Sequence, residues 1–237
     1  MANFILHKAD TRGRGDFGWL KTRYTFSFSN YYNPDRMNFG TLRVLNDDII
    51  EGGGGFDTHA HDNMEIITIP LEGELEHRDS MGNTSVIRQG EIQVMSAGTG
   101  IYHSEYNRNT SIPVKLLQIW VFPARLNVEP RYDQIQVDAA DRHNKLQQIV
   151  APGPSDEGMW IYQKAWFSLG QLEEGIMTRY KFKGEKTGLY AFVIKGDLQL
   201  EDHSLSTRDG LGIWNAGEVT IRAESSSEFL LMEVPMG

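Results

Sequence analysis

The sequence predicts an all-β protein built of two β-sandwich or jelly-roll barrels in one chain. Short runs rich in β-branched and aromatic residues recur along the chain, such as Val114–Phe122, Ala191–Lys195 and Phe229–Val234. The 24 glycines and the frequent turn clusters between these runs fit many hairpins. One order of strands and glycines also occurs twice, which indicates a duplicated barrel.

The strand pattern extends to two weaker segments. Leu71–His77 and Leu198–Asp202 alternate in the period of a strand, so we predict a strand at each. Helix signals are few, and the best window is Ala139–Val150, where we predict a helix. Many short strands with frequent turns are typical of a sandwich or barrel rather than a βαβ fold.

The internal repeat divides the chain into two halves. In each copy an apolar strand, a turn made by glycine and an acidic residue, and an alternating strand precede an Arg-x-Gly turn and a strand ending in Ala-Gly. The shared glycines are Gly73, Gly90 and Gly98 in the first copy and Gly196, Gly210 and Gly217 in the second. We therefore predict domains at residues 1–130 and 131–237, with residues 127–155 connecting the barrels.

Composition excludes several classes of protein. The 237 residues are 40% hydrophobic and 23% charged, as in folded globular proteins. The formal charge of −9 argues against direct binding to a nucleic-acid backbone. The absence of cysteine excludes disulfides, thiolate metal sites and cysteine nucleophiles. With neither a visible secretory signal nor a long apolar stretch, we expect a cytoplasmic protein without a membrane span.

Two short motifs carry the chemistry. His59 and His61 are two residues apart, so on a strand both imidazoles point to one face, and His103 and Glu105 repeat that spacing. If the two strands face each other, three imidazoles and one carboxylate meet, a donor set that suits Fe(II), Mn, Co, Ni, Cu or Zn. One or two positions would stay open for water, substrate or O₂. The competing interpretation is that these are ordinary surface or hydrogen-bonding histidines.

The second repeat lacks this pattern. Counted from the shared glycines, Phe182 and Gly184 replace the first two histidines, while Arg222 and Glu224 replace the His-x-Glu pair. We predict that the second barrel holds no metal and that Arg222 and Glu224 form an ion pair filling the lost site.

The other histidines and the aromatic residues mostly have structural explanations. We predict that His77 is exposed on its strand rather than a fifth ligand, and that the remaining histidines outside the motifs lie at the surface: His7, His143 and His203. Four tryptophans in apolar strand contexts are predicted core residues: Trp19, Trp120, Trp166 and Trp214. Phe56, Met64 and Met95 flank the ligand strands and are either core or pocket residues.

The motifs resemble those of the pirin family, in the bacterial branch described as quercetinase-like bicupins. The first family motif, Gly-x5-His-x-His-x3-Glu, is present as Gly53, His59, His61 and Glu65. The second motif is present as Gly90, Gly98, His103 and Asn107. The resemblance is strongest over residues 14–125 and includes the segments Gly18–Phe28, Phe39–Asn46 and Met95–Glu105.

The resemblance implies one divalent metal in the first barrel, held by the residues that match His59, His61, His103 and Glu105. We expect Fe(II) first, with Ni, Co, Mn, Cu or Zn as alternatives, and no further cofactor. The implied reaction is the O₂-dependent ring opening of a flavonol-like substrate, as in quercetin 2,3-dioxygenases. Glu105 and Glu65 are the two candidates for the general base that takes the substrate's hydroxyl proton.

Two departures from the general motifs stand out. Ser96 occupies a position where most cupins have proline, which pirins share, and Asp62 replaces a basic residue that the family has beside its ligands. The negative charge of Asp62 leaves open how an acidic flavonol-type substrate is tolerated.

Two other functional hypotheses stay open. One is a metal- or redox-dependent regulatory protein that binds a transcription factor or a metabolic enzyme, and the other is a cupin isomerase or small-ligand binder. A channel to the open metal positions would favour an enzyme. We expect a monomer, because the duplication already supplies the contact that single-barrel cupins gain by dimerising.

Overall fold

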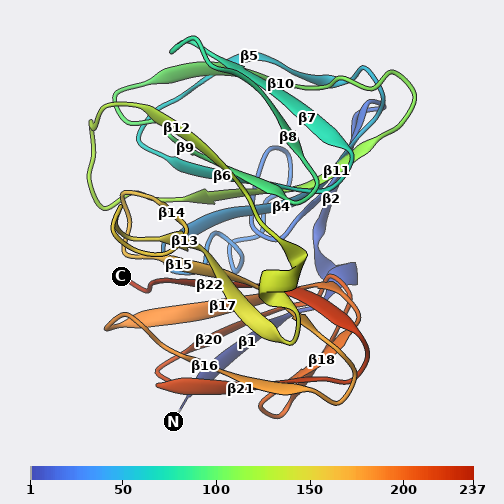
Figure 1. The fold of residues 1–237 in the computed structure, drawn as a ribbon, viewed down its shortest axis with the longest axis vertical. Coiled ribbons are helices and arrows are strands. Elements are labelled where there is room, and N and C mark those ends of the chain that lie inside the picture. The colour runs from blue at the N-terminus through green and yellow to red at the C-terminus, as the bar shows by residue number, and fades with distance from the viewer. Residues whose placement is uncertain (1) are drawn as a thin grey trace.

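The computed structural model describes residues 2–237, whose regular secondary structure is almost entirely β-strand, arranged in four stacked sheets (Figure 1). The predicted all-β, two-barrel fold is confirmed. The strands of the first sandwich are β2 (Gly13–Asp16), β3 (Leu20–Tyr24), β4 (Leu42–Ile50), β5 (Gly55–His61), β6 (Glu65–Glu72), β7 (Glu74–Asp79), β8 (Thr84–Arg88), β9 (Glu91–Ser96), β10 (Ile101–Asn107), β11 (Val114–Val121) and β12 (Arg131–Gln136).

The second sandwich repeats the same plan. Its strands are β1 (Asn3–His7), β13 (Lys145–Ala151), β14 (Met159–Trp160), β15 (Trp166–Leu172), β16 (Met177–Lys181), β17 (Thr187–Lys195), β18 (Asp197–Leu200), β19 (His203–Ser206), β20 (Gly210–Trp214), β21 (Glu218–Ala223) and β22 (Ser227–Pro235). Two short 3₁₀ helices, η1 (Ala9–Thr11) and η2 (Ala139–Arg142), complete the elements of residues 2–237.

Each sandwich has a seven-stranded and a four-stranded sheet. In the first, the order β12-β9-β6-β11-β4-β3-β2 packs on β5-β10-β7-β8. In the second, the order β1-β20-β17-β22-β15-β13-β14 packs on β16-β21-β18-β19. The two seven-stranded sheets lie in the middle of the molecule, and the four-stranded sheets are the outer layers (Figure 1).

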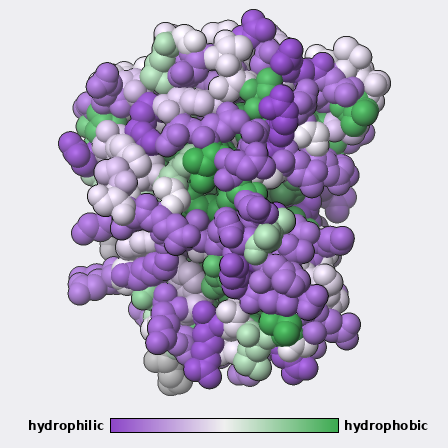
Figure 2. All heavy atoms as spheres, viewed as in Figure 1, coloured by the Kyte–Doolittle hydropathy of each residue, from purple (hydrophilic) through white to green (hydrophobic). Residues whose placement is uncertain are grey.

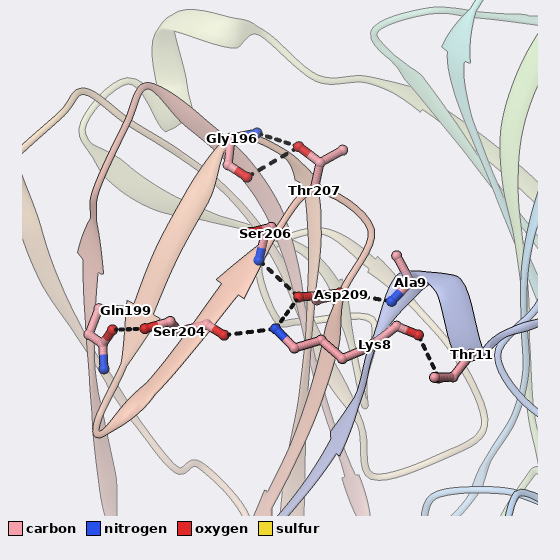
Figure 3. A network of polar contacts seen from close by, with 9 residues as sticks. All are labelled: Lys8, Ala9, Thr11, Gly196, Gln199, Ser204, Ser206, Thr207 and Asp209. Atoms are coloured by element: carbon pink, nitrogen blue, oxygen red, sulfur yellow. Dashed lines mark hydrogen bonds and ion pairs between the residues drawn. The ribbon is translucent and has the colours of Figure 1, made fainter.

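Two strands belong to the sandwich on the other side of the predicted boundary at residue 130. β1, from the N-terminus, pairs along its length with β20 of the second sandwich, whereas β12 pairs with β9 of the first. Asp209 holds the N-terminal segment in place: it accepts a hydrogen bond from the Ala9 amide at 2.7 Å and pairs with Lys8 Nζ at 2.8 Å (Figure 3). β1 precedes residue 130 but pairs in the second sandwich, and β12 follows it but pairs in the first. The domain division at residue 130 stays a prediction.

Burial of apolar side chains joins the two sandwiches. One cluster contains residues of both seven-stranded sheets, including Leu45 and Ile119 from the first and Phe167, Phe192 and Leu230 from the second. The removal of this apolar surface from water is the dominant favourable contribution to their association.

The interiors of the two sandwiches differ. A continuous apolar cluster fills the second, around residues such as Leu189, Ile213 and Phe229. In the first, smaller apolar clusters form around Ile87 and around Met95, and polar residues occupy the space between. The first barrel therefore has room for a site in a place where the second has core.

Two predictions about local structure were wrong. No helix spans residues 139–150: after η2, Asn144 adopts a positive φ of 53°, and β13 then pairs with β15. Residues 127–155 do link the two sandwiches, and they also contain β12 of the first and β13 of the second. The segment 71–77 is not one strand, because Gly73, with a φ of 79°, makes the turn between β6 and β7.

The surface agrees with the composition. Figure 2 shows a face covered mostly by hydrophilic side chains, with apolar side chains exposed in small groups. Within residues 2–237, no helix has the length and apolar character needed to cross a bilayer.

Candidate metal centre

Three histidines meet inside the first barrel. β5 and β10 pair antiparallel, and the register places His103 directly opposite His59. The ring centroids of these two lie 4.4 Å apart, and the His61 ring lies 4.9 Å from each. One ring nitrogen from each residue lies within 4.8 Å of the others. The predicted grouping of the imidazoles is therefore present, on neighbouring strands of one sheet rather than on opposite sheets.

Glu105 lies beside this group. The register between β5 and β10 shifts between His103 and Glu105, an irregularity of the kind that often re-aims side chains next to active sites. The Glu105 carboxylate is buried and accepts hydrogen bonds from Gln118 Nε2 at 3.1 and 3.2 Å. It forms a second compact group with His103 and His77 rather than with all three imidazoles. Burial raises the pKa of Glu105 to about 7.

A hydrogen-bonded chain orients His103. Asp79 Oδ2 lies 3.0 Å from His77 Nε2, and His77 Nδ1 lies 3.4 Å from His103 Nδ1. Because Asp79 can only accept when ionised, His77 Nε2 carries a proton and its Nδ1 accepts from His103. His103 Nε2 then bears the lone pair, and this buried atom has no hydrogen-bond partner among the described residues. Such outer contacts are typical of metal-binding histidines.

Burial favours the neutral form of two of these rings, His61 and His103. Burial lowers the pKa of His103 to about 2 and that of His61 to about 4. Burial opposes ionisation of Asp79, but hydrogen bonds from His77 and Asn83 outweigh it and lower its pKa. Neutral imidazoles with free lone pairs beside a buried carboxyl group are the donors that a divalent transition metal requires. The residues therefore fit such a metal.

The predictions for His77 and His7 were wrong. His77 is fully buried, in contact with His103, and His7 is buried against Tyr190. The signal for His77 was present in the sequence, because it alternates with buried Leu75 on one face of β7. His143 is exposed, as predicted, and His203 is half-buried.

A cavity of about 160 Å³ opens beside the imidazoles. Phe56 lines this cavity, whereas Met64 and Met95 pack in an apolar cluster behind it. Trp120 is half-buried rather than core: its ring contacts His61 edge to face at 4.9 Å, and its side chain lines the cavity. The other three predicted core tryptophans are also half-buried: Trp19, Trp166 and Trp214.

Glu65 lies on the other side of its strand from the cavity. Its carboxylate accepts a hydrogen bond from Ser96 Oγ at 2.6 Å, and burial raises its pKa to about 7. The next residue, Ile66, faces the cavity instead. Strand alternation thus directs the Glu65 carboxylate away from the histidines.

The second barrel has lost its site differently from the prediction. Arg222 and Glu224 do form an ion pair, with Nε and Oε1 3.5 Å apart, but both side chains are exposed. The inward positions of β21 are Val219, Ile221 and Ala223, which pack in the apolar core. Arg222, the position counted from the glycines, is on the exposed face of β21, and apolar packing fills the inside of the barrel instead of an ion pair.

Two β-sandwich barrels in one chain, with a histidine-based metal centre in the first, define a bicupin metalloprotein. The chain matches the family model described as Pirin over residues 7–121 and the model described as quercetinase C-terminal cupin domain over residues 148–234. It belongs to the pirin family.

The similarity to known members extends over nearly the full chain. The chain is 42% identical to quercetin 2,3-dioxygenase from Escherichia coli (strain K12), over 97% of this chain and 98% of that protein. A pirin-like protein from Caulobacter vibrioides is 36% identical, over 94% and 96%. The crystal structure of the bacterial pirin YhhW from Escherichia coli in complex with nickel(II) has a TM-score of 0.94 and 39% identity, covering 99% and 100%. The donor set and this nickel-bound relative support a divalent-metal site in this chain.

Proposed function

We propose that this protein is a metal-dependent dioxygenase that opens the ring of a flavonol-like substrate with O₂, a reaction of the quercetin 2,3-dioxygenase type. The observation that carries the proposal is the convergence of three imidazoles on a largely apolar cavity. The names of relatives such as the Escherichia coli quercetin 2,3-dioxygenase support the reaction class.

The proposed metal ligands are His59, His61, His103 and Glu105. Fe(II) is the proposed resident ion, and the nickel-bound relative supports a site that also accepts other divalent ions. When bound, the metal supplies Lewis acidity, which lowers the pKa of an enolic hydroxyl on the substrate.

Glu105 is the proposed general base. Its carboxylate lines the cavity, and it takes this role in the state in which it has left the metal. In this role one Glu105 oxygen takes the proton of the substrate hydroxyl, while Gln118 Nε2 holds the carboxylate in position. Glu65, the second candidate, is hydrogen-bonded to Ser96 outside the cavity, so the geometry supports Glu105 more strongly.

The regulatory hypothesis has no specific observation in its favour. Access to the metal site was the feature expected to separate the two, and a cavity lined by Phe28, Phe56 and Trp120 reaches the imidazoles. This arrangement suits a small aromatic substrate. A monomeric state and a cytoplasmic location stay predictions.

The experiment measures turnover of quercetin by protein reconstituted with Fe(II) in the presence of O₂. Turnover is monitored as the loss of flavonol absorbance. We expect turnover in the wild-type protein and its loss in the His59→Ala variant. His143→Ala is the matched control, because this histidine is exposed and does not line the cavity. Metal-loaded protein that turns over no flavonol would refute the proposal.

A further inference from the structure

The metal-site cavity is the inner of two neighbouring chambers. The outer chamber, of about 180 Å³, lies between the β2–β3 region and β4. The residues that line both chambers are Phe28, Asn46, Asp48 and Phe56. The chambers therefore adjoin along these four residues, which form their shared wall.

The volumes of the two chambers limit the size of the ligand that they can hold. Pockets that hold drug-sized ligands measure roughly 300 Å³ or more. The inner chamber of about 160 Å³ falls below that range, and so does the outer one of about 180 Å³. Only the two chambers together reach that range, which suits a ligand with more than one ring. Phe17 and Ser29 line the outer chamber and are exposed, which places the entrance there.

The outer chamber is built from aromatic rings. Trp19 and Phe56 pack edge to face with centroids 5.0 Å apart, and Tyr24 and Phe28 lie 5.7 Å apart. Phe28 also packs edge to face on Trp120 of the inner chamber, at 5.2 Å. Aromatic surfaces arranged in this way favour a flat aromatic ring as the occupant.

Two polar groups on the shared wall lack partners. Asn46 Oδ1 and Asp48 Oδ1 are buried and have no hydrogen-bond partner within residues 2–237. Among the described residues, no Lys or Arg lines either chamber to neutralise Asp48. Buried acceptors without donors are costly and rare, so a ligand that donates hydrogen bonds is the natural complement.

We propose that Asn46 and Asp48 form a hydroxyl-binding subsite that positions a polyhydroxylated aromatic ligand across the two chambers. The inference rests on the proposed function for the hydroxyl that faces the imidazoles, and it assigns the ligand's other hydroxyl groups to Asn46 Oδ1 and Asp48 Oδ1. The ligand's second ring then lies among Trp19, Tyr24 and Phe28. The subsite selects for hydroxylation at positions distant from the reacting centre.

The test compares two probes under anaerobic conditions, in which neither is consumed: quercetin, with several hydroxyl groups, and 3-hydroxyflavone, with one. Calorimetry on the metal-loaded protein measures both affinities. We expect quercetin to bind tenfold or more tightly than 3-hydroxyflavone, since hydrogen bonds to buried polar groups discriminate strongly. Equal affinities in the unaltered protein would overturn the proposal without any variant.

The variants are Asn46→Leu and Asp48→Leu, which keep side-chain volume and remove the acceptors. We expect the preference for quercetin to fall at least threefold in each, with the affinity for 3-hydroxyflavone unchanged. Gln93→Leu is the matched control, because Gln93 is also buried without a partner among the described residues yet lines neither chamber. An equal loss for both probes would contradict the subsite.

A fluorescence readout places the ligand independently of the variants at the shared wall. Trp19 lines the outer chamber, so quercetin and 3-hydroxyflavone should quench its emission. The quenching caused by each ligand should therefore be larger in the wild-type protein than in Trp19→Phe. Absence of that difference would contradict occupancy of the outer chamber. Binding selectivity without turnover would refute the proposed reaction and keep the subsite, whereas turnover without selectivity would do the reverse.

Discussion

Replacing His77 with phenylalanine tests the chain that orients His103. His77 is fully buried between Asp79 and His103, so water cannot take over its hydrogen bonds. Asp79 keeps its bonds from the amides of Met81 and Asn83, so the variant does not orphan that carboxylate. The substitution therefore mainly affects the tautomer and the orientation of the His103 ring.

The magnitude follows from the geometry. Loss of a residue that orients a metal ligand typically weakens metal binding 10- to 100-fold. The 3.4 Å separation of His77 Nδ1 and His103 Nδ1 is long for a hydrogen bond, so we place the effect near the lower limit. We expect about a tenfold loss of affinity, equivalent to about 1.4 kcal/mol.

The assay is competition for Ni²⁺ against a chromophoric chelator, with thermal unfolding of the metal-free proteins measured in parallel. His143→Phe, at an exposed histidine, provides the control and should bind metal as the wild type does. If His77→Phe binds Ni²⁺ within twofold of the wild type while His103→Ala does not bind it, the orienting chain is refuted.

Three further predictions concern stability. Addition of Ni²⁺ at 100 times its Kd should stabilise the metal-free protein by about 2.7 kcal/mol in thermal unfolding, and a His59→Ala variant that keeps this gain would contradict the site. Burial raises the pKa of Glu65 from 4.5 to about 7, so between these pH values the folded state keeps a proton that the unfolded state releases. The stability that this group contributes is therefore lost as the pH rises from about 4.5 to 7. Glu65→Gln should therefore gain up to about 3 kcal/mol relative to the wild type between pH 5 and pH 8, and equal pH profiles in urea unfolding would refute this. Phe229→Ala, in the fully buried core of the second barrel, should cost about 3 to 5 kcal/mol in urea unfolding with unchanged metal content, and a cost below about 1 kcal/mol would show that the site collapses.

The fold and the grouping of the histidines were predictable because their signals are local. Residues two apart on a strand share a face, so His59 and His61 were expected to converge, and they do. The strands at 114–122 and 229–234 were equally clear from β-branched and aromatic residues. Ala139–Val150 misled because its apolar spacing fits both periods, and pairing of β13 with β15 decides in favour of a strand.

The surroundings of the site depend on contacts distant in sequence. His77 joins the histidine group because β7 pairs with β10, a register that no local pattern shows. Asn46 and Asp48 face the chambers because β4 lies between β11 and β3. The position of β1 in the second sandwich likewise depends on its pairing with β20. Pairing between distant strands, rather than composition, determines these positions.

Metal content measured residue by residue tests the central claim most directly. The wild-type protein and the single variants of His59, His61, His103 and Glu105 to alanine would be reconstituted with Fe(II) or Ni²⁺, desalted and subjected to elemental analysis. We predict about one equivalent of metal in the wild type and strong loss of metal in each histidine variant. Glu105→Ala should retain part of the metal, less than the wild type. Full metal content in the histidine variants, or none in the wild type, would contradict a single site built from these residues.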